Sequence, residues 1–126
     1  MNETQKIFLN LISASLTGTK NDTISELDTQ MVQELETLAR QNACFSIMCE
    51  MLAKNNINIP QTWKNVSSFV VLDSFRKLSV ETEILSLLKK NGIRACVLKG
   101  STVAVNYPNP LSRALGDVDI LVDSHN

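Results

Sequence analysis

Two aspartates near the end of the chain, Asp117 and Asp119, have the residue type and the spacing of a site for a divalent metal ion. The surrounding apolar run predicts a β-strand over residues 118–122. Successive side chains of a strand point to opposite faces, so we expect the two carboxylates to project from one face. Oxygen ligands of this kind suit Mg²⁺. The alternative is a solvated polar strand end, so the prediction depends on the neighbouring residues.

A second candidate site is the turn at Gly100-Ser101, between an apolar run at residues 93–98 and a predicted short helix at 101–106. Backbone amides at a strand-to-helix turn, a helix dipole and a hydroxyl all favour phosphate oxygens. A plain tight turn capped by Ser101 is the alternative interpretation.

Two basic residues flank these motifs. Lys99 and Arg113 are candidates for phosphate contact, since a positive side chain suits that task. They could equally pair with Asp117 or Asp119, or lie in solvent. For Tyr107, which lies among turn residues, we favour packing over stacking on a base.

The combined pattern is Leu98-Lys99-Gly100, Tyr107-Pro108, Arg113 and the run from Asp117 to Val122. It resembles the nucleotidyltransferase fold of the DNA polymerase beta superfamily, and is most similar to a poorly characterised bacterial branch. The resemblance implies that Asp117 and Asp119 hold Mg²⁺ and that Gly100-Ser101 contacts the triphosphate of an NTP. It implies transfer of a nucleoside monophosphate to an acceptor hydroxyl. The acceptor and the preferred base are not implied.

In the resembled superfamily a third carboxylate, on a later strand, completes the metal site. The present sequence ends at Asn126, seven residues after Asp119. We therefore expect an N-terminal fragment of a longer enzyme, weak or inactive alone. The alternatives are a non-catalytic nucleotide- or partner-binding module, in an antitoxin-like or regulatory role, and a helical interaction domain in which the motifs are coincidental.

Composition limits the other classes of function. The 126 residues suffice for one domain with a core, and the net charge of −1 gives no support to a surface that coats nucleic acid or a membrane. No apolar window reaches the length of a bilayer span. Three cysteines in a chain without secretory features suggest reduced thiols, each a small buried apolar side chain, in a cytoplasmic protein.

The predicted fold class is α+β, with a mostly helical region over residues 1–90 packed on the opening β-α-β portion of a nucleotidyltransferase domain over 91–126. Apolar periodicity and capping residues predict four helical segments. The first covers residues 4–16, the second begins at Asp28 or Thr29, and the third carries Phe45 to Leu52. The fourth, over residues 61–90, is one long helix or two in tandem. Trp63 is expected in a core or interface, and nothing favours His125 as a ligand. Exposed apolar surface on the long helix, or a free sheet edge, could drive formation of a homodimer.

Overall fold

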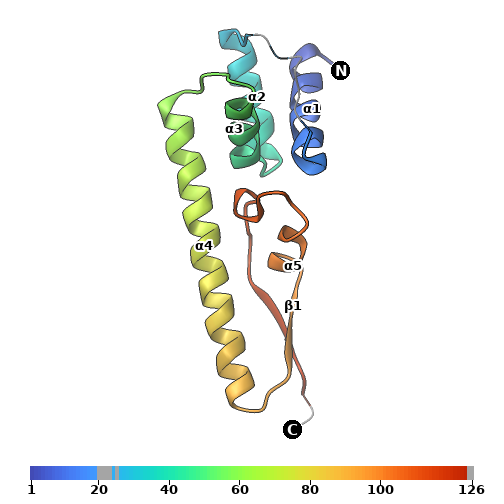
Figure 1. Ribbon diagram of the computed structural model, residues 1–126, viewed down its shortest axis with the longest axis vertical. Helices are drawn as coiled ribbons and strands as arrows, with labels where there is room; N and C mark the ends of the chain where they lie inside the picture. Colours follow the sequence, from blue (N-terminus) through green and yellow to red (C-terminus); the bar gives the residue numbers. More distant parts are fainter. Residues whose placement is uncertain (20–23, 25, 125–126) are drawn as a thin grey trace.

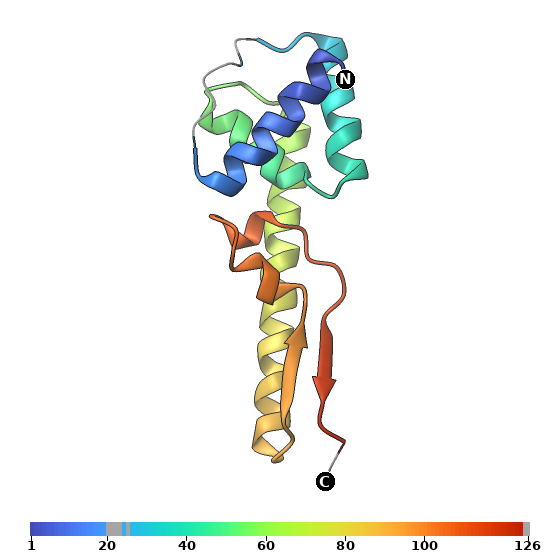
Figure 2. The same cartoon turned by 90° about the vertical axis from the view of Figure 1, so that its right-hand side faces the viewer.

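One long helix organises the molecule. The computed structural model describes residues 1–19, 24 and 26–124. Helix α4 (Gln61–Lys90) spans its 30 residues, about 45 Å at 1.5 Å per residue. Three helices pack near the start of α4, and a small sheet and a short helix lie along its second half (Figures 1 and 2). The N-terminus lies at the helical end, and the C-terminus at the sheet end (Figure 1).

The three packed helices are α1 (Glu3–Thr17), α2 (Thr29–Gln41) and α3 (Phe45–Lys54). Asn2 and Gln5 form a capping box at the start of α1, and Gly18 ends it in the left-handed conformation at φ 70°. The Asp28 side chain caps α2 by accepting a hydrogen bond from the Met31 backbone. These helices lie where the apolar periodicity predicts them, with boundaries shifted by one or two residues.

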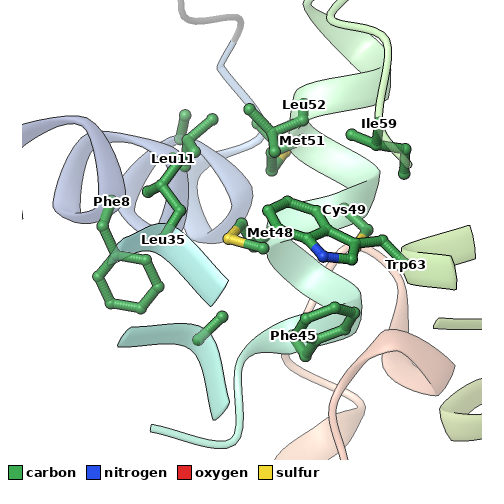
Figure 3. Close-up of a cluster of buried hydrophobic side chains, with 12 residues drawn as sticks. Phe8, Leu11, Leu35, Phe45, Met48, Cys49, Met51, Leu52, Ile59 and Trp63 are labelled. Carbon is green, nitrogen blue, oxygen red and sulfur yellow. The ribbon is translucent and has the colours of Figure 1, made fainter. Parts of the chain in front are cut away.

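The hydrophobic core lies at this helical end (Figure 3). Leu11, Leu35 and Leu52 are fully buried, each on a different helix. Trp63, at the start of α4, packs edge-on against Phe45 with ring centroids 5.5 Å apart. The predicted core role of Trp63 is therefore confirmed, and the core joins α4 firmly to the three shorter helices.

Helix α4 is a single continuous helix rather than two in tandem. No glycine or proline interrupts residues 61–90, and Asn91 follows as the C-cap. Gly92 then adopts a left-handed φ of 71°, and the Ile93 backbone donates to the carbonyl of Leu88. Such a left-handed cap ends the helix as Asn91-Gly92 predicts.

The sheet has two strands, β1 (Ala95–Leu98) and β2 (Asp119–Val122), paired antiparallel. Helix α5 (Ser101–Ala104) and a single 3₁₀ turn, η1 (Pro110–Ser112), connect them. The predicted order of strand, helix and strand is confirmed. In detail α5 is two residues shorter than predicted, β2 begins one residue later, and η1 was not predicted.

Several large apolar side chains remain exposed along α4 and the sheet. They belong to the outer face of α4 and to both strands, and include Phe69, Leu72, Val80, Ile84, Leu87, Leu98 and Leu121. Most of the apolar period that predicts α4 is thus solvent-exposed rather than core. Nothing in the structure shows what covers this surface, so homodimer formation stays a prediction, as does the division of the chain into two regions at residue 90.

The thiols are free, as predicted for Cys44, Cys49 and Cys96. Cys49 is buried and Cys44 is half-buried, but Cys96 is exposed on β1, so the predicted burial is wrong for Cys96. The reason is that the outward face of β1 has no covering element among the described residues. No helix in the described part of the chain is long and apolar enough to cross a membrane.

Candidate functional site

The antiparallel register brings the two sequence motifs together. Asp119, the first residue of β2, pairs directly with Leu98, the last residue of β1. The Gly100-Ser101 turn follows Leu98 immediately, so it lies at the same end of the sheet. A Cβ placed on Gly100 would lie 4.0 Å from the Asp117 carbonyl oxygen. The aspartates and the turn are therefore neighbours, although 16 residues separate Ser101 from Asp117 in sequence.

Both aspartates of the candidate metal site are exposed. Exposure alternates from Asp117 to Ile120, with both aspartates exposed and Val118 and Ile120 half-buried. This alternation agrees with the expectation that the carboxylates share a face, although regular strand pairing begins only at Asp119. Within the described residues neither carboxylate forms an ion pair. Pairing of Lys99 or Arg113 with these aspartates, the alternative interpretation, does not occur in the structure.

The turn has an unusual backbone. Lys99 and Gly100 both have positive φ values, 59° and 47°. A lysine seldom adopts this conformation, and such residues concentrate at functional sites. The carbonyls of Lys99 and Gly100 accept hydrogen bonds from residues 102–104, whereas the N–H groups of Gly100 and Ser101 have no partner in the part of the chain described. The turn therefore presents two unsatisfied donors.

Arg113 reaches the turn from the connection before β2. Its Nη1 donates a long hydrogen bond of 3.5 Å to the Gly100 carbonyl oxygen. The guanidinium also lies over the Tyr107 ring, 5.9 Å from the ring centroid, within the range of a cation–π contact. Tyr107 thus packs against Arg113, which agrees with the predicted packing role. Lys99 is exposed.

Helix α4 fixes the connection that leads to the aspartates. Ser74, almost fully buried, donates a hydrogen bond of 3.3 Å to the Arg113 carbonyl oxygen. Lys77 donates one of 2.6 Å to the Leu115 carbonyl oxygen, and its ammonium also pairs with Asp73 at 2.7 Å. Irregular backbone beside a helix needs such partners, because unpaired buried carbonyls are costly. The connection before the aspartates is therefore held in place by hydrogen bonds from α4.

Sequence reasoning missed one residue that touches the site. Glu81 on α4 is only 8% exposed, and its Oε1 accepts a hydrogen bond of 2.7 Å from the Ser101 hydroxyl. One signal was available: Glu81 stands four residues before Leu85 and seven before Leu88, both half-buried. This signal was not used, because the more regular apolar period of α4 lies on the opposite, exposed face of the helix.

The residues present fit a magnesium ion in part. Two exposed, unpaired carboxylates are hard oxygen donors, and Mg²⁺ is commonly held by one or two carboxylates together with substrate phosphates. Among the described residues no group of three or more His, Cys, Asp and Glu side chains could hold a metal ion. The pair would therefore need phosphate oxygens to complete the coordination. His125 lies outside the described residues.

The strand-helix-strand unit, the glycine turn and the aspartate pair all lie between Ala95 and Val122, in the C-terminal part of the chain. A model of the family described as uncharacterised nucleotidyltransferase matches residues 28–126, and the chain belongs to that family. The match begins at the cap of α2 and includes helices α2 to α4 as well as the sheet. No curated protein and no solved structure matches the chain. The roles of the individual site residues remain predictions.

Proposed function

We propose that the chain binds an NTP with Mg²⁺ at the Gly100 turn, for transfer of its nucleoside monophosphate to an acceptor hydroxyl. The observation that carries the proposal is the register that sets Asp119 opposite Leu98, beside the turn. It brings two carboxylates that form no ion pair with any described residue to the end of the sheet where the turn lies, with its two N–H groups that have no described partner. A metal triphosphate needs this combination, because its cation seeks carboxylates and its phosphate oxygens seek donors and positive charge.

Each residue has a distinct role in this proposal. The N–H groups of Gly100 and Ser101 donate to triphosphate oxygens, and Lys99 and Arg113 supply positive charge. Tyr107 restrains the Arg113 guanidinium through their ring contact. Asp117 and Asp119 would hold Mg²⁺, which when bound neutralises phosphate charge and favours ionisation of the acceptor hydroxyl. In the reaction, the acceptor hydroxyl loses its proton to solvent, its oxygen bonds to the α-phosphorus, the bond from that phosphorus to the α,β-bridging oxygen breaks, and pyrophosphate leaves.

The four-residue length of α5 changes one part of the expectation. A macrodipole grows from peptide units aligned along a helix, and a single turn of helix contributes little of it. The proposal therefore depends on the free N–H groups of the turn and on the nearby cations rather than on a helix dipole.

A nucleotide-binding module without transfer activity is the second candidate. The absence of a third acidic side chain beside Asp117 and Asp119, within the described residues, favours this candidate. In the resembled superfamily that third carboxylate helps to deprotonate the acceptor. Such a module would bind the nucleotide through the turn and the nearby cations, without depending on the aspartate pair.

Thermal unfolding with and without nucleotide separates these candidates. We expect an NTP to raise the melting temperature more with Mg²⁺ than with EDTA, and the double change Asp117→Asn with Asp119→Asn to abolish the Mg²⁺-dependent part. Glu26→Gln with Glu83→Gln removes two exposed negative charges elsewhere and is the matched control. A nucleotide shift that survives the aspartate changes would favour the binding module. No nucleotide shift in the unmodified chain would contradict both candidates.

A further inference from the structure

Glu81 is a buried carboxylate in an unusual setting. Acidic side chains are rarely buried unless paired. Glu81 is 8% exposed, yet within the described part of the chain it forms no ion pair. Its partner is the Ser101 hydroxyl, at 2.7 Å. A buried carboxylate held by one hydroxyl is costly to desolvate, so its position calls for an explanation beyond stability.

The hydrogen bond to Glu81 determines what Ser101 can offer a ligand. A serine hydroxyl has one proton, and in the structure it is donated to the Glu81 oxygen. The same hydroxyl cannot at that moment donate to a phosphate. The backbone N–H groups of Gly100 and Ser101 remain without a partner among the described residues. The side chain of Ser101 is thus engaged with Glu81, while its backbone N–H has no partner among the described residues.

Glu81 is one of three α4 side chains that form hydrogen bonds to the site or to the connection before it. Ser74, Lys77 and Glu81 are spaced by three and four residues, so they lie on one face of the helix. The first two hold the carbonyls of Arg113 and Leu115, on the aspartate side of the site. Glu81 accepts a hydrogen bond from Ser101 in the turn. A single helix face therefore sets the position of the turn relative to the aspartates.

We propose that Glu81 is a positioning residue for nucleotide binding: through the Ser101 hydroxyl it fixes the Gly100-Ser101 turn so that the two backbone N–H groups face the triphosphate. The inference rests on the proposed function and deepens it. It assigns the phosphate contact of Ser101 to the backbone rather than to the hydroxyl. For this role the side chain at position 81 must accept a hydrogen bond from Ser101, and its negative charge is not required.

Titration calorimetry of Mg²⁺ with ATP, GTP, CTP and UTP, on the 126-residue chain and its variants, tests the proposal. We expect Glu81→Ala and Ser101→Ala each to weaken nucleotide affinity by about tenfold, and their combination to weaken it no further. Glu81→Gln keeps an acceptor oxygen and should bind within about twofold of the unmodified chain. Ser46→Ala removes a buried hydroxyl contact between α3 and α4, with Ser67 at 3.0 Å, that involves none of the proposed site residues, and should lower stability while leaving affinity nearly unchanged.

Two results would overturn the proposal. One is an affinity loss in Glu81→Ala no larger than that in Ser46→Ala at equal fractions of folded protein. The other is additive loss in the double variant, which would mean that Ser101 contacts the phosphate independently. If Glu81→Ala does not fold, a tenfold loss in Glu81→Gln would contradict the proposal by the same measurement.

A measurement without nucleotide separates this proposal from the proposed function. ¹⁵N order parameters of Gly100 and Ser101 report how rigid the turn is. We expect them to fall in Glu81→Ala and Ser101→Ala and to stay unchanged in Glu81→Gln and Ser46→Ala. If the unmodified chain binds no nucleotide, the proposed function fails. If the order parameters do not respond to Glu81→Ala, the positioning role fails.

Discussion

The ammonium of Lys77 donates a 2.6 Å hydrogen bond to the carbonyl oxygen of Leu115, two residues before Asp117. The contact joins the middle of α4 to the segment that carries the metal-binding candidates. It is reinforced by Asp73, which pairs with the same ammonium at 2.7 Å. Lys77 is thus positioned to control where the connection before β2 runs.

Replacing Lys77 by methionine tests this contact. Lys77→Met keeps most of the apolar side chain but removes the donor, so the Leu115 carbonyl loses a partner and Asp73 loses its cation. We expect a loss of about 1–2 kcal/mol in the free energy of unfolding, measured by urea titration. Lys64→Met, at an exposed α4 position, is the matched control and should change stability by less than about 0.5 kcal/mol. Equal effects of the two changes would contradict the assignment.

Gly100→Ala tests the conformation of the turn. The nearest atom to an added Cβ is 4.0 Å away, so the change meets no steric clash. The cost comes from the backbone, since a φ of 47° with a ψ of −110° is rarely adopted by residues with a side chain. We expect destabilisation by about 1–3 kcal/mol together with weaker nucleotide binding.

Gly92→Ala provides the comparison for Gly100→Ala. Gly92 also has a positive φ, 71°, and open space around its Cβ, but it lies at the end of α4 away from the turn. It should lower stability by about 1 kcal/mol without changing nucleotide affinity in the folded protein. Equal nucleotide affinity of Gly100→Ala and Gly92→Ala, measured by calorimetry, would show that the turn does not contribute to nucleotide binding.

Glu50 on α3 accepts hydrogen bonds from Ser112 in η1 and from Asn109 just before it, and these contacts predict a pH dependence of stability. Burial alone would raise the pKa of Glu50, but hydrogen bonds from Ser112, Lys54 and Asn109 and the Lys54 charge outweigh it, and the pKa is lowered. A lowered folded-state pKa stabilises the fold above the unfolded value of about 4.3, and this contribution disappears as pH falls through the folded value.

Melting temperatures between pH 7 and pH 3 test the role of Glu50. The unmodified chain should lose stability as the pH falls below about 4.3, and Glu50→Gln should lose less over that interval because it has no carboxylate to protonate. Glu83→Gln, an exposed position on α4, should follow the unmodified chain. A parallel pH profile for Glu50→Gln would show that the Ser112 contact adds nothing to stability.

Much of the helical architecture follows from local signals in the sequence. The Asp28 cap, Gly18 and Gly92 mark helix ends by the chemistry of single residues, and the structure has the ends there. The uninterrupted stretch at residues 61–90 predicts a helix, but its most regular apolar period lies on the exposed face. Periodicity identifies the helix and does not by itself say which face is buried.

The arrangement of the site depends on contacts that sequence spacing does not contain. The aspartate pair and the glycine turn are recognisable motifs, but their proximity depends on the pairing of Leu98 with Asp119. The contact of Glu81 with Ser101 depends on how α4 packs against the turn, 20 residues later in the chain. The spacing of Glu81 from Leu85 and Leu88 indicates that it lies on the buried face of α4, but nothing in the neighbouring residues identifies Ser101 as its partner.

The central claim is that Asp117 and Asp119 hold a divalent ion together with a triphosphate. Mn²⁺ is a paramagnetic substitute for Mg²⁺, and its free concentration can be followed by electron paramagnetic resonance in the presence of a non-hydrolysable NTP analogue. We predict that the unmodified chain, with the analogue, binds Mn²⁺ more tightly than the analogue does alone, and that Asp117→Asn with Asp119→Asn removes this gain. Equal Mn²⁺ binding by the unmodified chain and the double variant would contradict the claim.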